Sequence, residues 1–167
     1  MALIDEGKKA PAFSLKDQSG KKHSLKDYAG RPVVLYFYPR DDTSGCTKEA
    51  CAFRDLLPRF KRSKAVVLGV SPDSEKSHAN FAGKHDLNFT LLADVPVKSG
   101  DNAEDKGTPQ VCAKYGVWQE KSNYGRKYMG VVRTTYLIDG AGKVARRWDK
   151  VKVAGHAEEV LEAVKRL

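Results

Sequence analysis

Three cysteines are the side chains best suited to chemistry in this sequence, and Cys46 is the one whose surroundings favour it. It follows an apolar run and a polar loop, residues 40–45, and it stands where apolar residues begin to recur at helical spacing. The free amides and the positive dipole end of a helix N-terminus favour an anion, so a thiol there can have its pKa lowered to roughly 3.5–7.5. We therefore predict that Cys46 acts as a nucleophilic thiolate.

The other candidate residues have plainer interpretations when each is taken alone. Cys51 and Cys112 stand in helical patterns, where a buried thiol packs as a small apolar side chain. Arg133 by itself is most simply a solvated surface residue. No C-x-x-C or H-x-x-x-H pair accompanies the cysteines and the four histidines, so the sequence predicts no metal site.

The formal charge of +9 suggests a polyanionic partner as one alternative. However, the basic residues are spread along the chain, most of them have acidic neighbours, and no recognised nucleic-acid-binding motif is present. We therefore predict a solvated basic surface and no nucleic-acid partner. A nucleic-acid-binding module, the alternative, would lose affinity steeply with salt and would be indifferent to substitution of Cys46.

The hydrophobic pattern predicts the elements that must position Cys46. Residues 33–38 and 65–70 are apolar throughout, which is typical of strands buried on both faces of a sheet. Further strands are expected around residues 13–15, 23–25, 90–92, 134–138 and 144–148. Helices are expected from near Cys46 with a kink or weak point at Pro58, from 71–74 to about 84, at 108–116 and at 155–167.

These elements predict a single domain, residues 1–167, of the α/β class: a mixed central sheet with helices on both faces and an N-terminal β-hairpin. Residues 94–107 have no periodicity and are expected to form a surface loop insertion. The N-terminus lacks the pattern of a secretory signal, and no stretch approaches the ~18 apolar residues of a membrane span. We therefore expect a cytoplasmic protein with no membrane partner.

Several separated motifs resemble the peroxiredoxin family. Pro39, Thr43 and Cys46 match its P-x-x-x-T-x-x-C signature. Cys51, in the run CTKEAC, matches the second cysteine of the bacterioferritin-comigratory, or Q-type, branch. The runs YGVW, EKS and RTTYLID are also similar to that branch, and the resemblance covers essentially the whole chain apart from the loop insertion.

The resemblance implies a thioredoxin-like fold and a thiol peroxidase that reduces hydrogen peroxide and organic hydroperoxides without a metal or organic cofactor. Cys46 would attack the peroxide and become a sulfenic acid. Thr43 would hydrogen-bond the thiolate and the peroxide, and Pro39 would shield the pocket from water. Arg133 would approach from a distant strand to stabilise the thiolate and polarise the O–O bond.

The resemblance also implies that Cys51 is the resolving cysteine. It would form an intramolecular disulfide with Cys46, and thioredoxin or a similar dithiol protein would reduce that bond. Cys112 matches a position that the family does not require, so we expect it to pack within its helix. The branch further implies a monomer. The nearest alternative, a thioredoxin-fold oxidoreductase without peroxidase activity, would be expected to carry the C-x-x-C pair that this chain lacks.

A disulfide between Cys46 and Cys51 makes a demand on the helix that would carry them. In a regular helix the two Cα atoms are about 8.7 Å apart and the side chains point ~140° apart around the axis. A disulfide needs Cα atoms within roughly 7 Å of each other. We therefore expect the first turns of this helix to unwind when the bond forms.

Overall fold

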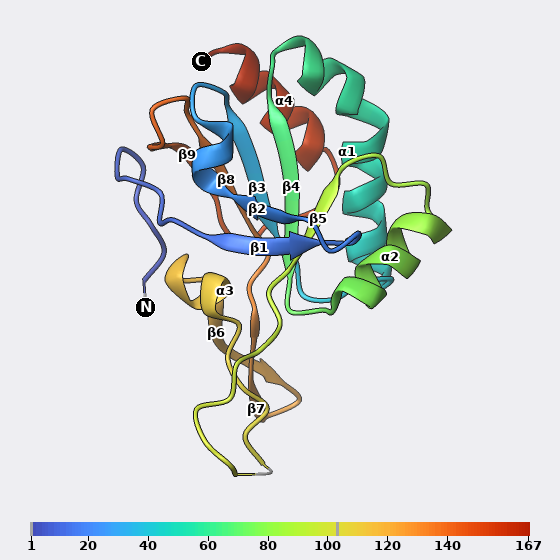
Figure 1. Cartoon of the computed structure of the whole chain (residues 1–167), viewed down its shortest axis with the longest axis vertical. Coiled ribbons are helices and arrows are strands. Elements are labelled where there is room, and N and C mark those ends of the chain that lie inside the picture. Colours follow the sequence, from blue (N-terminus) through green and yellow to red (C-terminus); the bar gives the residue numbers. More distant parts are fainter. Residues whose placement is uncertain (1, 103) are drawn as a thin grey trace.

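A seven-stranded mixed sheet forms the centre of the molecule (Figure 1). The computed structural model describes residues 2–102 and 104–167 and shows the strand order β2-β1-β5-β4-β3-β8-β9. The strands are β1 (Ser14–Asp17), β2 (Lys22–Ser24), β3 (Val33–Phe37), β4 (Val66–Ser71), β5 (Thr90–Ala93), β8 (Thr134–Ile138) and β9 (Val144–Trp148). Strands β3, β4 and β5 are parallel, and all other pairs in this sheet are antiparallel. The expected mixed sheet and its N-terminal hairpin, β1–β2, are confirmed.

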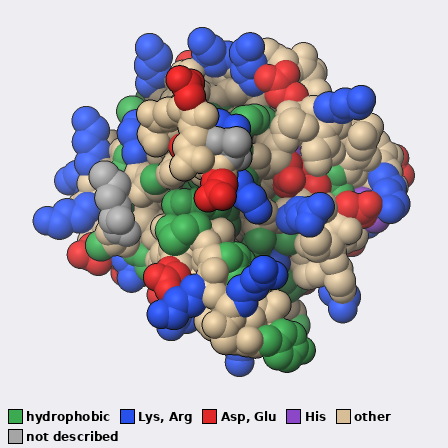
Figure 2. All heavy atoms as spheres, turned by 90° about the horizontal axis from the view of Figure 1, so that it is seen from below, with side chains coloured by type: hydrophobic (Ala, Val, Ile, Leu, Met, Phe, Trp, Pro, Cys, Tyr) green, Lys and Arg blue, Asp and Glu red, His purple; other side chains and the backbone are tan. Residues whose placement is uncertain are grey.

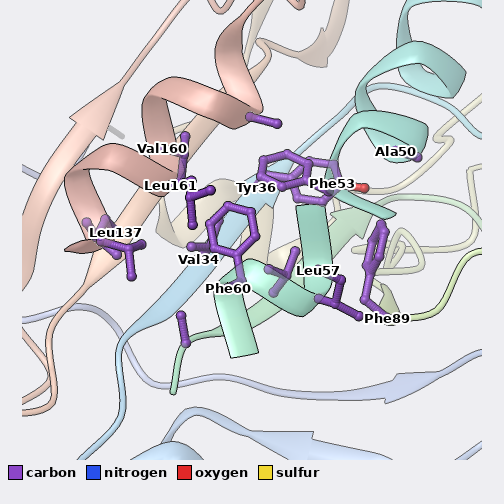
Figure 3. Packing of buried hydrophobic residues seen from close by; sticks show 14 of the residues in the cluster. Val34, Tyr36, Ala50, Phe53, Leu57, Phe60, Phe89, Leu137, Val160 and Leu161 are labelled. Carbon is purple, nitrogen blue, oxygen red and sulfur yellow. The ribbon is translucent and has the colours of Figure 1, made fainter. Parts of the chain in front are cut away.

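Helices pack on both faces of this sheet, as expected. The helices of the described residues are α1 (Ser44–Arg62), α2 (Glu75–Lys84), α3 (Gln110–Lys114), α4 (His156–Lys165) and the short 3-10 helix η1 (Leu25–Tyr28). On one face Tyr36 of β3 stacks on Phe53 of α1, with ring centroids 4.7 Å apart, and Val160 of α4 belongs to the same buried cluster (Figure 3). On the other face Phe37 of β3 and Cys112 of α3 belong to a second buried cluster.

The helix α1 forms because its apolar residues recur on one side. Its buried residues are Cys46, Glu49, Ala50, Phe53, Leu57 and Phe60. The helix begins directly after Thr43, whose extended backbone makes it the N-cap residue, and it continues through Pro58 to Arg62. The weak point expected at Pro58 therefore does not end the helix.

A second, two-stranded sheet was not predicted from the sequence. It consists of β6 (Trp118–Asn123) and β7 (Arg126–Val131), which pair antiparallel across a tight turn. Most residues of the two strands are exposed or half-buried, and Val131 alone is buried. Because most of this hairpin is not covered by other elements, it lacks the alternation of apolar and polar residues by which strands are recognised.

The described residues between 94 and 107 lie at the same end of the molecule as this hairpin, the lower end in Figure 1. The described part is irregular backbone from 94 to 107, with one isolated bridge joining Val97 to Thr108, and residue 103 lies outside the described residues. Figure 2 views this end and shows Lys and Arg side chains dispersed among neutral and hydrophobic ones. Within the described ranges, no helix is both long and apolar enough to span a bilayer.

Candidate active site

Cys46 lies in the first turn of α1, where the structure confirms a helix N-terminus. Its side chain is almost completely buried, with 2% exposed. The first turn contains no acidic residue that would oppose a thiolate. The helix amides and dipole therefore offer an anion at Cys46 a favourable environment.

Arg133 reaches Cys46 from 87 residues further along the chain. It lies between β7 and β8, and its Nη2 donates to the Sγ of Cys46 at 3.3 Å. Gly45 makes room for this contact, since a Cβ at that position would lie 3.3 Å from the same Nη2. Burial alone would lower the pKa of Arg133, but Glu49 and Cys46 raise it above its ordinary value, so the guanidinium stays charged. The predicted pairing of Arg133 with Cys46 is present in the geometry.

Glu49 is the site residue that sequence reasoning missed. Its side chain is 1% exposed, and its Oε1 accepts from Arg133 Nη1 at 2.7 Å, so one guanidinium contacts both the thiol and the carboxyl. Burial raises the pKa of Glu49 to about 7, although Arg133 lowers it. Its Oε2 has no hydrogen-bond partner among the described residues. The sequence does carry one signal for Glu49: it is a charged residue on the otherwise apolar face of the helix, one turn after Cys46.

Thr43 and Pro39 lie in the loop that leads into α1. Thr43 is exposed, and its hydroxyl donates to the backbone oxygen of Arg40 at 3.0 Å. In the described residues it makes no hydrogen bond to Cys46, which is the contact expected of it. Pro39 is half-buried just beyond the end of β3. Both residues therefore precede Cys46 in the same loop, and the Thr43 hydroxyl is hydrogen-bonded to the backbone.

A buried polar network anchors the same loop. Asp41 accepts from Tyr38 Oη at 2.6 Å and pairs with His78 Nδ1 at 2.7 Å, and His78 Nε2 donates to the backbone oxygen of Leu92 at 2.9 Å. The backbone amide of Asp41 donates to Asp73 at 2.8 Å. His78 is one of the four histidines for which the sequence predicts no metal site. Its hydrogen bonds instead fix the loop that carries Pro39 and Thr43.

This network is also the one group in the described chain with the spacing of metal ligands. It comprises Asp41, Asp73 and His78 and includes no cysteine. Each of the three side chains is already engaged in the hydrogen bonds described above. The arrangement is accounted for by loop anchoring.

The remaining two cysteines differ sharply in their surroundings. Cys51 is half-buried on α1, five residues after Cys46, and both thiols are free. Cys112 is completely buried, and its backbone amide donates to Asp94 at 2.7 Å. Burial, with a smaller contribution from Asp94, raises the pKa of Cys112 well above its usual range. Cys112 is therefore a protonated thiol packed in the core, whereas Cys51 lies on the same helix as Cys46.

Comparison with known proteins identifies relatives over nearly the full length of the chain. The family model described as the AhpC/TSA family matches residues 6–147. The protein of Coxiella burnetii named putative peroxiredoxin bcp is 48% identical over 158 residues, which cover 95% of this chain and 97% of that protein. Peroxiredoxin Bcp of Bacillus subtilis is 44% identical over 97% of this chain and 96% of its own.

A solved structure shows the same similarity in three dimensions. The bacterioferritin comigratory protein of Xanthomonas campestris, seen as a trapped intermediate/ligand complex in work on its alkyl peroxide reduction activity, has a TM-score of 0.82. Its sequence is 40% identical, and the match covers 97% of this chain and 98% of that one.

Proposed function

Because the chain belongs to the AhpC/TSA family and is a thiol peroxidase of the bacterioferritin-comigratory, or Q-type, peroxiredoxins, we propose that Cys46 is the thiolate that attacks the hydroperoxide. The observation that carries this proposal is the contact of Arg133 with the Sγ of Cys46 at 3.3 Å in the first turn of α1. In the described chain, Cys46 alone among the cysteines has both a helix N-terminus and an arginine beside it.

The first chemical step transfers one oxygen to sulfur. The Cys46 thiolate attacks the terminal oxygen of the hydroperoxide, the O–O bond breaks, and sulfur becomes a sulfenic acid while the other oxygen leaves as an alkoxide or hydroxide that takes up a proton. Arg133 stabilises the thiolate before the step and the negative charge that moves onto the leaving oxygen during it. The substrates are hydrogen peroxide and organic hydroperoxides, and the step requires no metal or organic cofactor.

The neighbouring residues shape the pocket for this step. Thr43 lies at the helix start, and rotation of its hydroxyl away from the Arg40 oxygen would let it donate to the peroxide. Pro39 has no N–H, so it borders the pocket without offering a competing donor. Glu49 holds Arg133 through the 2.7 Å contact and thereby keeps the guanidinium beside Cys46.

Cys51 completes the cycle as the resolving thiol. The Cys46 sulfenic acid and the Cys51 thiol condense to a disulfide with release of one water, and a dithiol protein such as thioredoxin then returns both to thiols. Two observations support Cys51 over Cys112: Cys51 lies on the helix of Cys46, and Cys112 is fully buried with a strongly raised pKa.

A coupled assay of peroxide consumption with thioredoxin and its reductase tests this assignment. We expect Cys46→Ser to abolish turnover, because no other thiol is activated. Cys51→Ser should consume one equivalent of peroxide and then stall, whereas Cys112→Ser, the matched control, should turn over at close to the wild-type rate. Residual turnover above a few per cent in Cys46→Ser would disprove the nucleophile, and a stall in Cys112→Ser alone would move the resolving role to Cys112.

We also propose that the enzyme works in the cytoplasm as a monomer. Three free thiols in one chain are typical of proteins kept in a reducing compartment. The monomer rests on the resemblance to the branch, and sedimentation of the reduced enzyme over a range of concentrations would test it.

A further inference from the structure

The hydrogen-bond ladder of α1 has a gap that another segment fills. Pro58 has no N–H, so the backbone oxygen of Arg54 cannot receive the usual bond from the residue four positions later. The side-chain amide of Asn88 donates to this oxygen instead, at 3.3 Å. The first and second halves of α1 therefore meet at Arg54, whose backbone oxygen is hydrogen-bonded by Asn88 from outside the helix.

The side chain of Arg54 strengthens the same connection. Its Nη1 donates to the backbone oxygen of His85 at 2.6 Å, and its Nε donates to Asp55 at 3.0 Å. A hydrogen bond from a charged donor is stronger than one from a neutral donor, and the bond from Arg54 to the His85 oxygen is partly buried. Arg54 is thus attached to residues 85–88 through both its backbone and its side chain.

The same short segment also holds the chain just before α1. Asp42 accepts from Lys84 Nζ at 2.8 Å and pairs with His85 Nε2 at 3.0 Å. These groups lower the pKa of the Asp42 carboxyl, but the pair is exposed and so contributes less than the Arg54 contacts. Residues 84–88 therefore contact both ends of the stretch 42–54, and we call these contacts the bracket.

The two proposed redox cysteines lie between the ends that the bracket holds. Cys46 and Cys51 cannot join while α1 is regular, so residues around them must unwind. If Asp42 and Arg54 stay in contact with residues 84–88, the unwound segment is a short loop held at both ends. Such a loop has less conformational entropy to lose when Cys46 and Cys51 meet than a segment unwound over the whole of α1.

We propose that Arg54 and Asn88 are positioning residues for disulfide formation, which confine the unwinding of α1 to residues 43–53 and leave the half from Asp55 to Arg62 helical. This inference rests on the proposed Cys46–Cys51 disulfide. The bond forms as the Cys51 sulfur displaces the hydroxyl of the Cys46 sulfenic acid, with one water released, so the bracket supplies geometry and takes no part in the electron balance.

Amide hydrogen exchange of the full chain in its reduced and peroxide-oxidised forms tests the proposal. In the wild type, oxidation should accelerate exchange of residues 46–53 at least 100-fold and change residues 55–62 less than threefold. In oxidised Asn88→Ala and Arg54→Ala, residues 55–62 should also accelerate, by about fivefold, since each lost hydrogen bond contributes on the order of 1 kcal/mol. The reduced forms of both variants should keep this half protected, because Leu57 and Phe60 remain packed.

Arg59→Ala is the matched control, since Arg59 is exposed on the same half of α1 and its side chain makes no hydrogen bond or ion pair with other described residues. It should exchange like the wild type in both forms. Asn88→Ala carries the test if Arg54→Ala fails to fold. The intact mass and the disulfide-linked peptide of oxidised wild type are measured first, because absence of a Cys46–Cys51 bond would refute the resolving pair itself. A disulfide accompanied by loss of protection at 55–62 in the wild type, or by unchanged protection there in both variants, would overturn the bracket alone.

Discussion

The contact between Arg133 and Cys46 depends on a residue that has no side chain. A Cβ at Gly45 would lie 3.3 Å from Arg133 Nη2, which is tighter than ordinary contact, so Gly45→Ala should push the guanidinium away by a few tenths of an ångström. Since complete loss of such a donor costs about 10²–10³ in rate, this partial displacement should slow peroxide reduction by up to about tenfold. Alanine also suits a helix better than glycine by roughly 0.5–1 kcal/mol, so the melting temperature should not fall.

Stopped-flow single-turnover reduction of hydrogen peroxide and thermal melting measure the two effects separately. Gly83→Ala is the control, because it lies within α2 and a Cβ there would meet nothing within 4 Å. It should gain the same helix stability without losing rate. Equal peroxide rates in the two variants would show that Arg133 does not need the space beside Gly45.

Sequence motifs predicted the two residues whose contact forms the centre of the candidate site, and they missed Glu49, which contacts one of them. Cys46 and Arg133 belong to recognised motifs, so their encounter across 87 residues could be expected. Glu49 interrupts an apolar helix face, and its meaning depends on Arg133 approaching from another part of the fold. The direction of the Thr43 hydroxyl depends on the backbone oxygen of Arg40, and no sequence pattern specifies that contact.

At the scale of elements, α1 contains a proline whose cost can be measured. Pro58→Ala restores an N–H for the Arg54 oxygen and removes a steric conflict, which together contribute about 3 kcal/mol in a helix interior. The loss of proline's constraint on the unfolded chain offsets about 1 kcal/mol of this gain. We expect the free energy of unfolding to rise by about 2 kcal/mol, in the reduced and the disulfide forms alike, because Pro58 lies outside the stretch that unwinds.

Urea unfolding of wild type and Pro58→Ala, with and without a reductant, provides the measurement. A gain below about 0.5 kcal/mol would mean that the bond from Asn88 compensates in full for the missing helix bond. A gain confined to the reduced form would place Pro58 inside the unwinding stretch.

The same scale explains which elements the sequence could predict. The strand β3 and the helix α1 were predictable because each buries a continuous or periodic apolar pattern. The hairpin β6–β7 was not, since its strands are held together by backbone pairing and leave most side chains exposed. Burial produces the apolar patterns from which elements are predicted, so a mostly exposed hairpin has no such pattern in its sequence.

At the scale of the whole molecule, two buried groups give stability opposite dependences on pH. Burial raises the pKa of Glu49 from 4.5 to about 7, so its contribution to stability is full below pH 4.5 and is lost as the pH rises to 7. Burial lowers the pKa of His156 from 6.5 to about 4, so its contribution is full above pH 6.5 and is lost as the pH falls towards 4. Each contribution amounts to about 3 kcal/mol, and the two oppose each other between pH 4.5 and 6.5.

Single variants should separate these contributions. Between pH 4.5 and 6.5 the free energy of unfolding of Glu49→Gln should rise with pH more steeply than that of the wild type, because only the His156 contribution remains. His156→Gln should show the opposite change in slope. Denaturant unfolding of the reduced proteins at several pH values measures the slopes, and slopes equal to wild type in both variants would contradict the two pKa values.

The burial of Cys46 has a consequence for reagents that are not substrates. Because Cys46 is 2% exposed, a small peroxide reaches its sulfur far more readily than a bulky electrophile does, whatever the intrinsic nucleophilicity of the thiolate. A large alkylating reagent must wait until α1 opens, so its labelling rate follows the population of the open helix. Peroxide turnover depends on the closed population. The rate of alkylation of Cys46 therefore reports the open population of α1, and the rate of peroxide reduction by the same sulfur reports the closed population.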